Sequence, residues 1–360
     1  MRTGVDNTAS TFASLPSWAM HAATTAAGPS STLLRALSPA TAPSTAPATP
    51  RPTGPASDKS GPRRADRPEI PLPERLGGYR IGRTLARGGM SVVVEAVGDG
   101  GAPVALKVMR PRGSGRHGER DAWDREVSIL SALRHPGLVP LLDQGTGEGG
   151  ELFIAMPLLE GRSARAEVVA MRGCDPGALA AATFDVMIPA FLEICSTLQY
   201  AHDCGVLHCD LKPSNIFMLR PGARRRALLL DWGVSVIGAH WTPGDRGVGA
   251  RPGGTPGYMS PEQIGNRVTD LDTRSDVYGL GALLYEFCTW RPVFRKGAPR
   301  RLMQDAVLGR VTPPQERRPD LRIPQALCDV IMAALDTDRR NRPGSAASMA
   351  EAVREAVYGR

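Results

Sequence analysis

Residues 208–215 read His-Cys-Asp-Leu-Lys-Pro-Ser-Asn and follow an apolar segment whose helical periodicity ends near His202. This stretch holds an aspartate, a lysine and an asparagine within six residues. On one short loop, Asp210 can act as a proton acceptor, Lys212 can face a transferred phosphate and Asn215 can bind a metal ion. Taken alone, a solvated surface loop is the alternative interpretation.

A second carboxylate follows sixteen residues after Asn215, where the apolar run 228–230 ends at Asp231 and a Trp-Gly pair. At the end of a strand, Asp231 can hold a cation, and an ordinary strand-end turn is the alternative. A zinc site is not favoured, because the nearby histidines and cysteines lack the paired spacing of structural zinc ligands (His202, Cys204, His208 and Cys209).

An ion pair is predicted further upstream, between Lys107 and Glu126. Lys107 lies in the strand-like run 103–109, where an inward-pointing ammonium needs an anion, and the alternative is an edge-strand lysine facing water. Glu126 lies within an apolar stripe of the helical pattern 118–134, beside Ala122, Ile129 and Leu133. An unpaired carboxylate there would be costly. We therefore expect the two side chains to pair.

A glycine-rich turn precedes that lysine. Residues 85–93 read Leu-Ala-Arg-Gly-Gly-Met-Ser-Val-Val and join two strand-like runs, with Lys107 fourteen residues after Val93. Glycines let backbone N–H groups approach phosphate oxygens without a Cβ in the way. Taken alone, the turn is most simply a hairpin connection.

Strand and helix patterns are segregated along the 360 residues, which suffice for one two-lobed domain. Strand-like runs come first (79–85, 92–97, 103–109, 138–143 and 151–156), and helical periodicity dominates after Gly161 (184–203, 275–290 and 325–335). This order predicts an α+β fold. Pro189 marks either the start of the helix at 184–203 or a kink in it.

The N-terminal part differs in composition from the rest of the chain. It is rich in Ala, Ser, Thr and Pro, and residues 7–57 contain no acidic residue. Such a segment buries too little apolar surface to offset its ordering entropy. We expect residues 1–74 to form a disordered tail that docks a partner, with residues 75–360 as the folded domain. An organelle transit peptide is the alternative, but arginines are sparse there.

Charge and cysteine usage restrict the partners and the compartment. The formal net charge is +8, but basic residues are scattered except at 224–226, so we expect no nucleic-acid binding. No uncharged apolar stretch reaches the length of a membrane span, and the first residues lack the apolar core of a secretory signal. Six cysteines without a C-x-x-C pair indicate reduced thiols in the cytoplasm.

The order of these motifs resembles the eukaryotic-type (Hanks-type) Ser/Thr protein kinase family in its bacterial branch. Three further matches follow in order: Gly-Thr-Pro-Gly-Tyr-Met-Ser-Pro-Glu at 254–262, Ser-Asp-Val-Tyr-Gly at 275–279, and Arg-Pro at 342–343. The likeness covers about residues 76–357. It implies a bilobal fold with a β-rich N-lobe at 75–156 and a hinge and helical C-lobe at 157–360.

The resemblance also implies residue roles. Asp210 would be the catalytic base, Lys212 would face the γ-phosphoryl group, and Lys107, held by Glu126, would anchor the α- and β-phosphates of ATP. Further nucleotide contacts would come from the glycine-rich turn and the strands beside it (Leu85, Ala86, Gly88, Ser91, Val93, Ala105, Met156 and Leu159). Mg²⁺, with Mn²⁺ as the alternative, would bind the metal ligands Asn215 and Asp231. Substrate-facing or structural roles would fall to Thr255, Glu262, Asp276 and Arg342.

Three departures from the family pattern bear on activity. Ala86 and Ser91 replace two glycines of the turn, which is expected to weaken ATP binding. Cys209 replaces the arginine that clasps a phosphorylated activation loop, so we expect little dependence on that phosphorylation; a redox role for this thiol is the alternative. Trp232 replaces a phenylalanine of similar size. The leading hypothesis is an active kinase of protein substrates; a pseudokinase scaffold and a small-molecule phosphotransferase are the alternatives.

Overall fold

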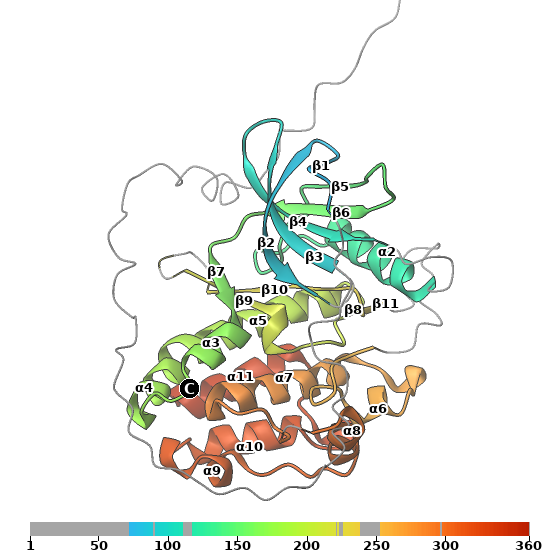
Figure 1. Cartoon of the computed structure of the whole chain (residues 1–360). Coiled ribbons are helices and arrows are strands. Elements are labelled where there is room, and N and C mark those ends of the chain that lie inside the picture. The colour runs from blue at the N-terminus through green and yellow to red at the C-terminus, as the bar shows by residue number, and fades with distance from the viewer. Residues whose placement is uncertain are drawn as a thin grey trace, which may run out of the picture.

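The structure, a computed structural model, describes residues 72–88, 91–110, 117–220, 222, 226–237, 253–295 and 297–359. The predicted disordered tail, residues 1–74, lies outside the described residues except for residues 72–74. Figure 1 shows a β-sheet with one helix, α2 (His117–Ala132), above a larger helical part. The predicted α+β fold with a β-rich N-lobe and a helical C-lobe is confirmed.

The N-lobe is built on a six-stranded antiparallel sheet with the strand order β1-β2-β3-β4-β6-β5. Its strands are β1 (Arg75–Leu76), β2 (Tyr79–Arg87), β3 (Ser91–Gly98), β4 (Pro103–Met109), β5 (Asp143–Thr146) and β6 (Leu152–Pro157). Alternate residues of β3 are buried on one face, as expected for a strand. They form a core with Leu106, Val108 and Phe153.

The register of the sheet places the predicted nucleotide-side residues on its other face. Val93 lies opposite Lys107 in the β3–β4 pair, and Ala105 lies opposite Met156 in the β4–β6 pair. Residues directly opposite each other in an antiparallel pair point to the same face, as do residues two apart in one strand. The four side chains therefore share the face that does not form the N-lobe core.

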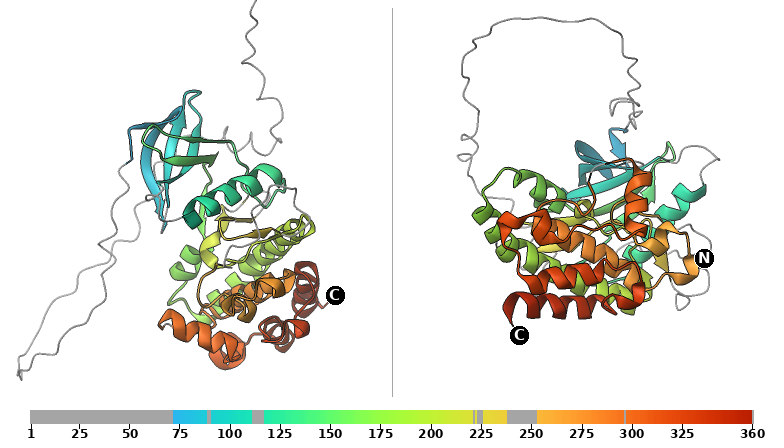
Figure 2. Two further views of the ribbon diagram at one scale, coloured as in Figure 1. Left: turned by 90° about the vertical axis from the view of Figure 1, so that its right-hand side faces the viewer. Right: turned by 90° about the horizontal axis from the view of Figure 1, so that it is seen from below.

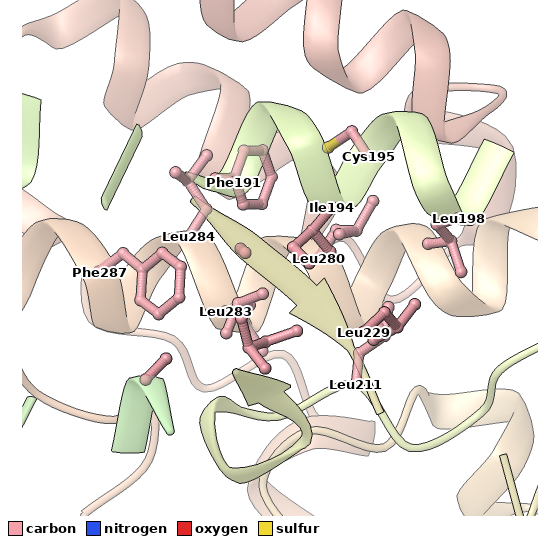
Figure 3. Packing of buried hydrophobic residues seen from close by; sticks show 14 of the residues in the cluster. Phe191, Ile194, Cys195, Leu198, Leu211, Leu229, Leu280, Leu283, Leu284 and Phe287 are labelled. Atoms are coloured by element: carbon pink, nitrogen blue, oxygen red, sulfur yellow. The ribbon is translucent and has the colours of Figure 1, made fainter. Parts of the chain in front are cut away.

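The C-lobe is organised around the helix α7 (Thr273–Thr289), in which every residue from Ser275 to Thr289 is buried. Its other helices are α3 (Ala164–Ala170), α4 (Pro176–Ala182), α5 (Ile188–Asp203), α6 (Pro261–Ile264), α8 (Pro299–Val307), α9 (Pro314–Arg317), α10 (Gln325–Ala334) and α11 (Ala346–Tyr358). Figure 3 shows Ile194 of α5 and Leu280 of α7 within one apolar cluster. This cluster is the main core of the domain.

Short strands line the top of the C-lobe, next to the N-lobe. They are β7 (Gly161–Ser163), β8 (Val206–Leu207), β9 (Ile216–Leu219), β10 (Ala227–Leu229) and β11 (Val236–Ile237). Strands β9 and β10 form an antiparallel hairpin, and of the arginine triplet 224–226 only Arg226 lies within the described residues. The left view of Figure 2 shows the same separation of sheet and helices.

Pro189 lies in the first turn of α5, which begins at Ile188, so the first of the two predicted alternatives is confirmed. A proline is tolerated there because the N–H groups of a first turn need no partner within the helix. A π-helical turn at Thr183–Met187 joins α5 to α4.

The helical segment Pro176–Asp203 is the one described helix long and apolar enough to cross a membrane. It carries Asp185 and Glu193 within its length. Its buried apolar residues pack against α7 and α11 in the core, which accounts for its composition.

The strand predicted at 138–143 is wrong. Leu138 and Val139 are buried, but the strand β5 begins only at Asp143. Pro140 explains the difference, because it cannot donate a hydrogen bond to a β-ladder.

Candidate active site

The predicted ion pair between strand β4 and helix α2 is present. The Lys107 Nζ donates to both carboxylate oxygens of Glu126, at 2.6 and 2.7 Å, and to the Asp231 Oδ1 at 3.1 Å. Burial alone would lower the pKa of Lys107, but the two carboxylates outweigh it and raise that pKa. The ammonium is therefore charged and lies between two carboxylates, one from each lobe.

Asp231 follows strand β10 and has a left-handed backbone, with φ of 65°. Such a conformation is uncommon for a residue other than glycine and is concentrated at functional sites. Burial alone would raise the pKa of Asp231, but the neighbouring Lys107 lowers it, so the carboxylate is ionised. The side chain keeps 47% of its surface exposed, which leaves it open to a cation.

The backbone of the segment 208–215 is hydrogen-bonded to Asp276 of helix α7. This buried carboxylate accepts the backbone N–H groups of His208 and Cys209, each at 2.8 Å, and the His202 Nε2 at 2.8 Å. Cys209 has a positive φ of 62°, a strained conformation for a side chain with a Cβ. The bonds to Asp276 offset that strain, so Asp276 has a positioning role.

Leucine packing fixes the same segment against α7. Leu211 is buried and lies against Gly279, where an added Cβ would come within 3.1 Å of the Leu211 Cβ. Figure 3 shows Leu211 beside Leu229 of β10, over helix α7. The segment 208–215 therefore packs directly against helix α7.

Asp210 lies at the centre of a small polar cluster. It accepts a hydrogen bond from the Thr255 hydroxyl at 2.7 Å and another from the Lys212 ammonium. Lys212 also donates to the Thr255 Oγ1 at 2.8 Å. The Asn215 amide nitrogen donates to the Asp210 carbonyl oxygen at 2.9 Å, which leaves the Asn215 amide oxygen for another ligand. The structure thus brings four predicted site residues together.

The predicted nucleotide-side residues lie around the sheet and the connection between the lobes. Leu85 and Ala86 belong to β2, and the Gly88 N–H donates to the Ser91 carbonyl at 2.8 Å across the turn. Leu159 lies between β6 and β7, where the chain passes from one lobe to the other. Their roles in binding ATP stay predictions.

A buried ion pair fixes the end of the segment 254–262. Glu262 and Arg342 form a bidentate pair, with the Nη1–Oε1 distance 2.7 Å and the Nη2–Oε2 distance 3.0 Å. Ser275 also donates to Glu262 at 2.8 Å. These contacts give Glu262 and Arg342 a structural role, because they join three parts of the C-lobe.

Sequence reasoning missed two polar residues near the site. Glu286 of α7 is fully buried, and its carboxylate accepts from the Tyr258 hydroxyl and, at 3.3 Å, from Arg165. The sequence feature that could have identified Glu286 is the one that identified Glu126, a carboxylate inside an apolar helical pattern. Gln263 donates to the Cys209 carbonyl at 2.7 Å, and nothing in the local sequence indicated that contact.

The comparison with family models decides the assignment. The model of the protein kinase domain matches residues 79–356. The chain belongs to the protein kinase family. The match covers both lobes and every motif described above. In this family ATP and a divalent metal ion are the general cofactors.

Curated relatives of this kinase chain include bacterial proteins. It is 32% identical over 283 residues to the serine/threonine-protein kinase pkn2 of Myxococcus xanthus, covering 77% of this chain and 32% of that protein. It is 33% identical over 274 residues to pkn3 of the same organism, covering 74% of this chain and 48% of that protein. It is 30% identical over 299 residues to the serine/threonine-protein kinase PknD of Chlamydia caviae, covering 78% of this chain and 31% of that protein. The chain thus spans less than half the length of these relatives.

Proposed function

We propose that this kinase chain transfers the γ-phosphoryl group of ATP to Ser and Thr hydroxyls of proteins. The observation that carries the proposal is the Lys107 ammonium between Glu126 and Asp231, at 2.6 and 3.1 Å. A scaffold without phosphotransfer does not need this costly arrangement of buried charges. The complete polar cluster around Asp210 further disfavours the pseudokinase alternative.

The residues present fit a nucleotide with a bound divalent ion. The exposed Asp231 carboxylate and the Asn215 amide oxygen are ligands of the type that Mg²⁺ prefers. We propose Mg²⁺ as the ion, with Mn²⁺ as the alternative. When bound, the ion would neutralise negative charge on the phosphate oxygens. Lys107 would hold the nucleotide phosphates at the edge of the same site.

Asp210 would accept the proton of the substrate hydroxyl. Its carboxylate already accepts a hydrogen bond from the Thr255 hydroxyl, on the side where the substrate would bind. A substrate hydroxyl within the same reach could give up its proton to this carboxylate. Lys212 contacts both residues and would stabilise negative charge that develops during transfer. Thr255 and Lys212 together orient the base.

The direct test is labelled phosphate transfer by the purified chain with Mg²⁺ and ATP. Matched peptides that differ only in a central Ser, Thr or Tyr serve as substrates. We expect label on the Ser and Thr peptides and little on the Tyr peptide. Label on Tyr alone would contradict the proposed specificity, and nucleotide binding without transfer to any peptide would favour the pseudokinase alternative.

Cys209, which stands where the family pattern has an arginine, leads to a prediction about regulation. Neutral hydrogen bonds from Gln263 to the carbonyls of Cys209, at 2.7 Å, and Gly253, at 3.3 Å, join the segment 208–215 to the chain at residues 253 and 263. No phosphate is needed for these bonds. We expect Thr242→Ala, at a position outside the described residues, to keep its activity, and phosphatase treatment to leave the wild type active.

Thr255→Ala is the contrasting variant, because Thr255 contacts Asp210 directly. It is expected to lose most of its activity. Loss of activity in Thr242→Ala together with loss after phosphatase treatment would refute independence from loop phosphorylation.

Location and partners are further proposals. All six cysteines are free thiols, and the Cys209 side chain is buried, which raises its pKa and favours a structural thiol over a redox one. These thiols support a reducing compartment, the cytoplasm. We also propose that the N-terminal tail docks a protein partner and that nucleic acid is not a ligand.

A further inference from the structure

A pocket of about 320 Å³ opens beside the Asp210 cluster. Its rim includes Lys212 and Thr255, whose side chains donate to the Asp210 carboxylate, and it continues to α3 and to the segment after α7. A peptide that presents a hydroxyl to Asp210 therefore passes over this pocket within a few extended residues. Side chains that line it can contribute to the choice of substrate.

The charged residues lining the pocket are all cations. They are Arg165, Arg172 and Lys212, and none of the described residues that line it carries a carboxylate. Lys212 is engaged with Asp210 and Thr255. Arg165 lies in the first turn of α3, and Arg172 lies in the turn that directly follows its C-terminal end; both line the pocket.

The two arginines are only partly neutralised. Arg165 contacts the buried Glu286 at 3.3 Å, yet 42% of its side chain is exposed. Within the described ranges, the Arg172 side chain makes no hydrogen bond or ion pair, and the residue is exposed. The adjacent Arg162, by contrast, is paired with Glu167 and does not line the pocket. The pocket thus carries an excess of positive charge.

Glu286 does not cancel this excess for a ligand. It is fully buried and does not line the pocket, and the Tyr258 hydroxyl donates to its second carboxylate oxygen. Burial raises the pKa of Glu286. Its contacts hold Arg165 at the pocket wall and leave the remaining guanidinium donors available to an anion.

We propose that Arg165 and Arg172 form a subsite for an anionic side chain of the protein substrate, within a few residues of the phosphorylated Ser or Thr. This inference rests on the proposed kinase function. The ligand is an oxyanion in either case: the planar carboxylate of Asp or Glu, or the tetrahedral phosphate of a phosphorylated residue. Guanidinium groups bind both with paired hydrogen bonds.

The test uses the full chain and peptides with one Ser acceptor in a neutral background. A single Glu, Lys or phosphoserine is placed at each position from four residues before the acceptor to four after it. We expect Glu to raise kcat/KM about three- to tenfold over Lys at one or two positions on one side of the acceptor. A larger gain with phosphoserine identifies primed substrates, and an equal gain identifies acidic ones.

Arg172→Gln and Arg172→Glu probe the subsite without touching the catalytic residues. We expect Gln to remove the preference for Glu, and Glu to reverse it in favour of Lys. Arg162→Gln is the matched control, because it removes the same charge from a neighbouring position outside the pocket and should keep the preference. Rising salt should reduce the preference in the wild type, as for any partly exposed ion pair.

A binding measurement separates this proposal from the proposed function. Peptides with Ala in place of Ser are titrated by fluorescence anisotropy, so no turnover is needed. We expect the acidic peptide to bind the wild type more tightly than the Lys peptide, and Arg172→Gln to bind both alike. Equal binding of the two peptides by the wild type would overturn the subsite, whether or not phosphate transfer is observed.

Discussion

Replacing Asp210 by Asn is expected to lower the rate of phosphate transfer by about 100- to 10,000-fold, the usual contribution of a general base. The amide has nearly the same shape as the carboxylate, but it cannot accept the hydroxyl proton. Asn can still accept a hydrogen bond from the Thr255 hydroxyl, which Asp210 accepts at 2.7 Å. The fold and nucleotide binding should therefore be kept while the chemical step is lost.

Single-turnover transfer of labelled phosphate measures the chemical step, and a nucleotide-binding titration measures the ground state. Asp203→Asn is the matched control, because Asp203 is an exposed carboxylate at the end of α5 that contacts Gln199. The control should transfer phosphate at the wild-type rate. If Asp210→Asn retained more than about a tenth of that rate, Asp210 would not be the base.

The part of the site that could be predicted from the sequence rests on the cost of buried charge. Lys107 and Glu126 each stand in an apolar pattern, and each needs an opposite charge to be tolerated there. The structure contains that pair, at 2.6 Å. The segment 208–215 was recognisable for a related reason, because several polar side chains occur together directly after an apolar helix.

The parts that were not predicted depend on contacts between distant segments. Gln263 contacts the Cys209 carbonyl 54 residues away, and no local pattern encodes such a pairing. Helix α4 lies in a part of the chain for which no element was predicted from the sequence; Asp175 caps it and Pro176 occupies its first turn. That cap signal was readable in the sequence. The resemblance to the family, and not periodicity, placed most of the remaining roles.

Replacing Arg342 by Met is expected to lower the free energy of unfolding by about 3–5 kcal/mol at neutral pH, the usual cost of removing one partner of a buried ion pair. The Arg342 and Glu262 side chains are 0% and 2% exposed. Methionine leaves the Glu262 carboxylate buried, with the Ser275 hydroxyl as its one side-chain partner among the described residues. Chemical denaturation of wild type and variant measures the difference.

The double variant Arg342→Met, Glu262→Met is the control. It removes the unpaired charge and should recover part of the loss, because apolar replacements of buried pairs are often tolerated. Recovery is expected to be incomplete, since Arg342 also donates to the Asp336 carbonyl at 2.8 Å and the Arg274 carbonyl at 2.9 Å. A double variant no more stable than the single one would show that the ion pair is not the source of the loss.

The same pair gives the loss a definite pH dependence. In the wild type, burial alone would raise the pKa of Glu262, but Arg342 lowers it below the ordinary value. The pair therefore stabilises the fold above the unfolded pKa of about 4.3, and that stability is lost as the pH falls through the lower folded pKa. In Arg342→Met, burial acts on Glu262 without the guanidinium and raises the pKa of that carboxyl. The folded state of the variant therefore loses stability at pH 7, and this loss disappears when Glu262 is protonated at low pH. The gap in stability between wild type and variant should thus narrow from pH 7 towards pH 4, and a gap independent of pH would contradict the assigned ion pair.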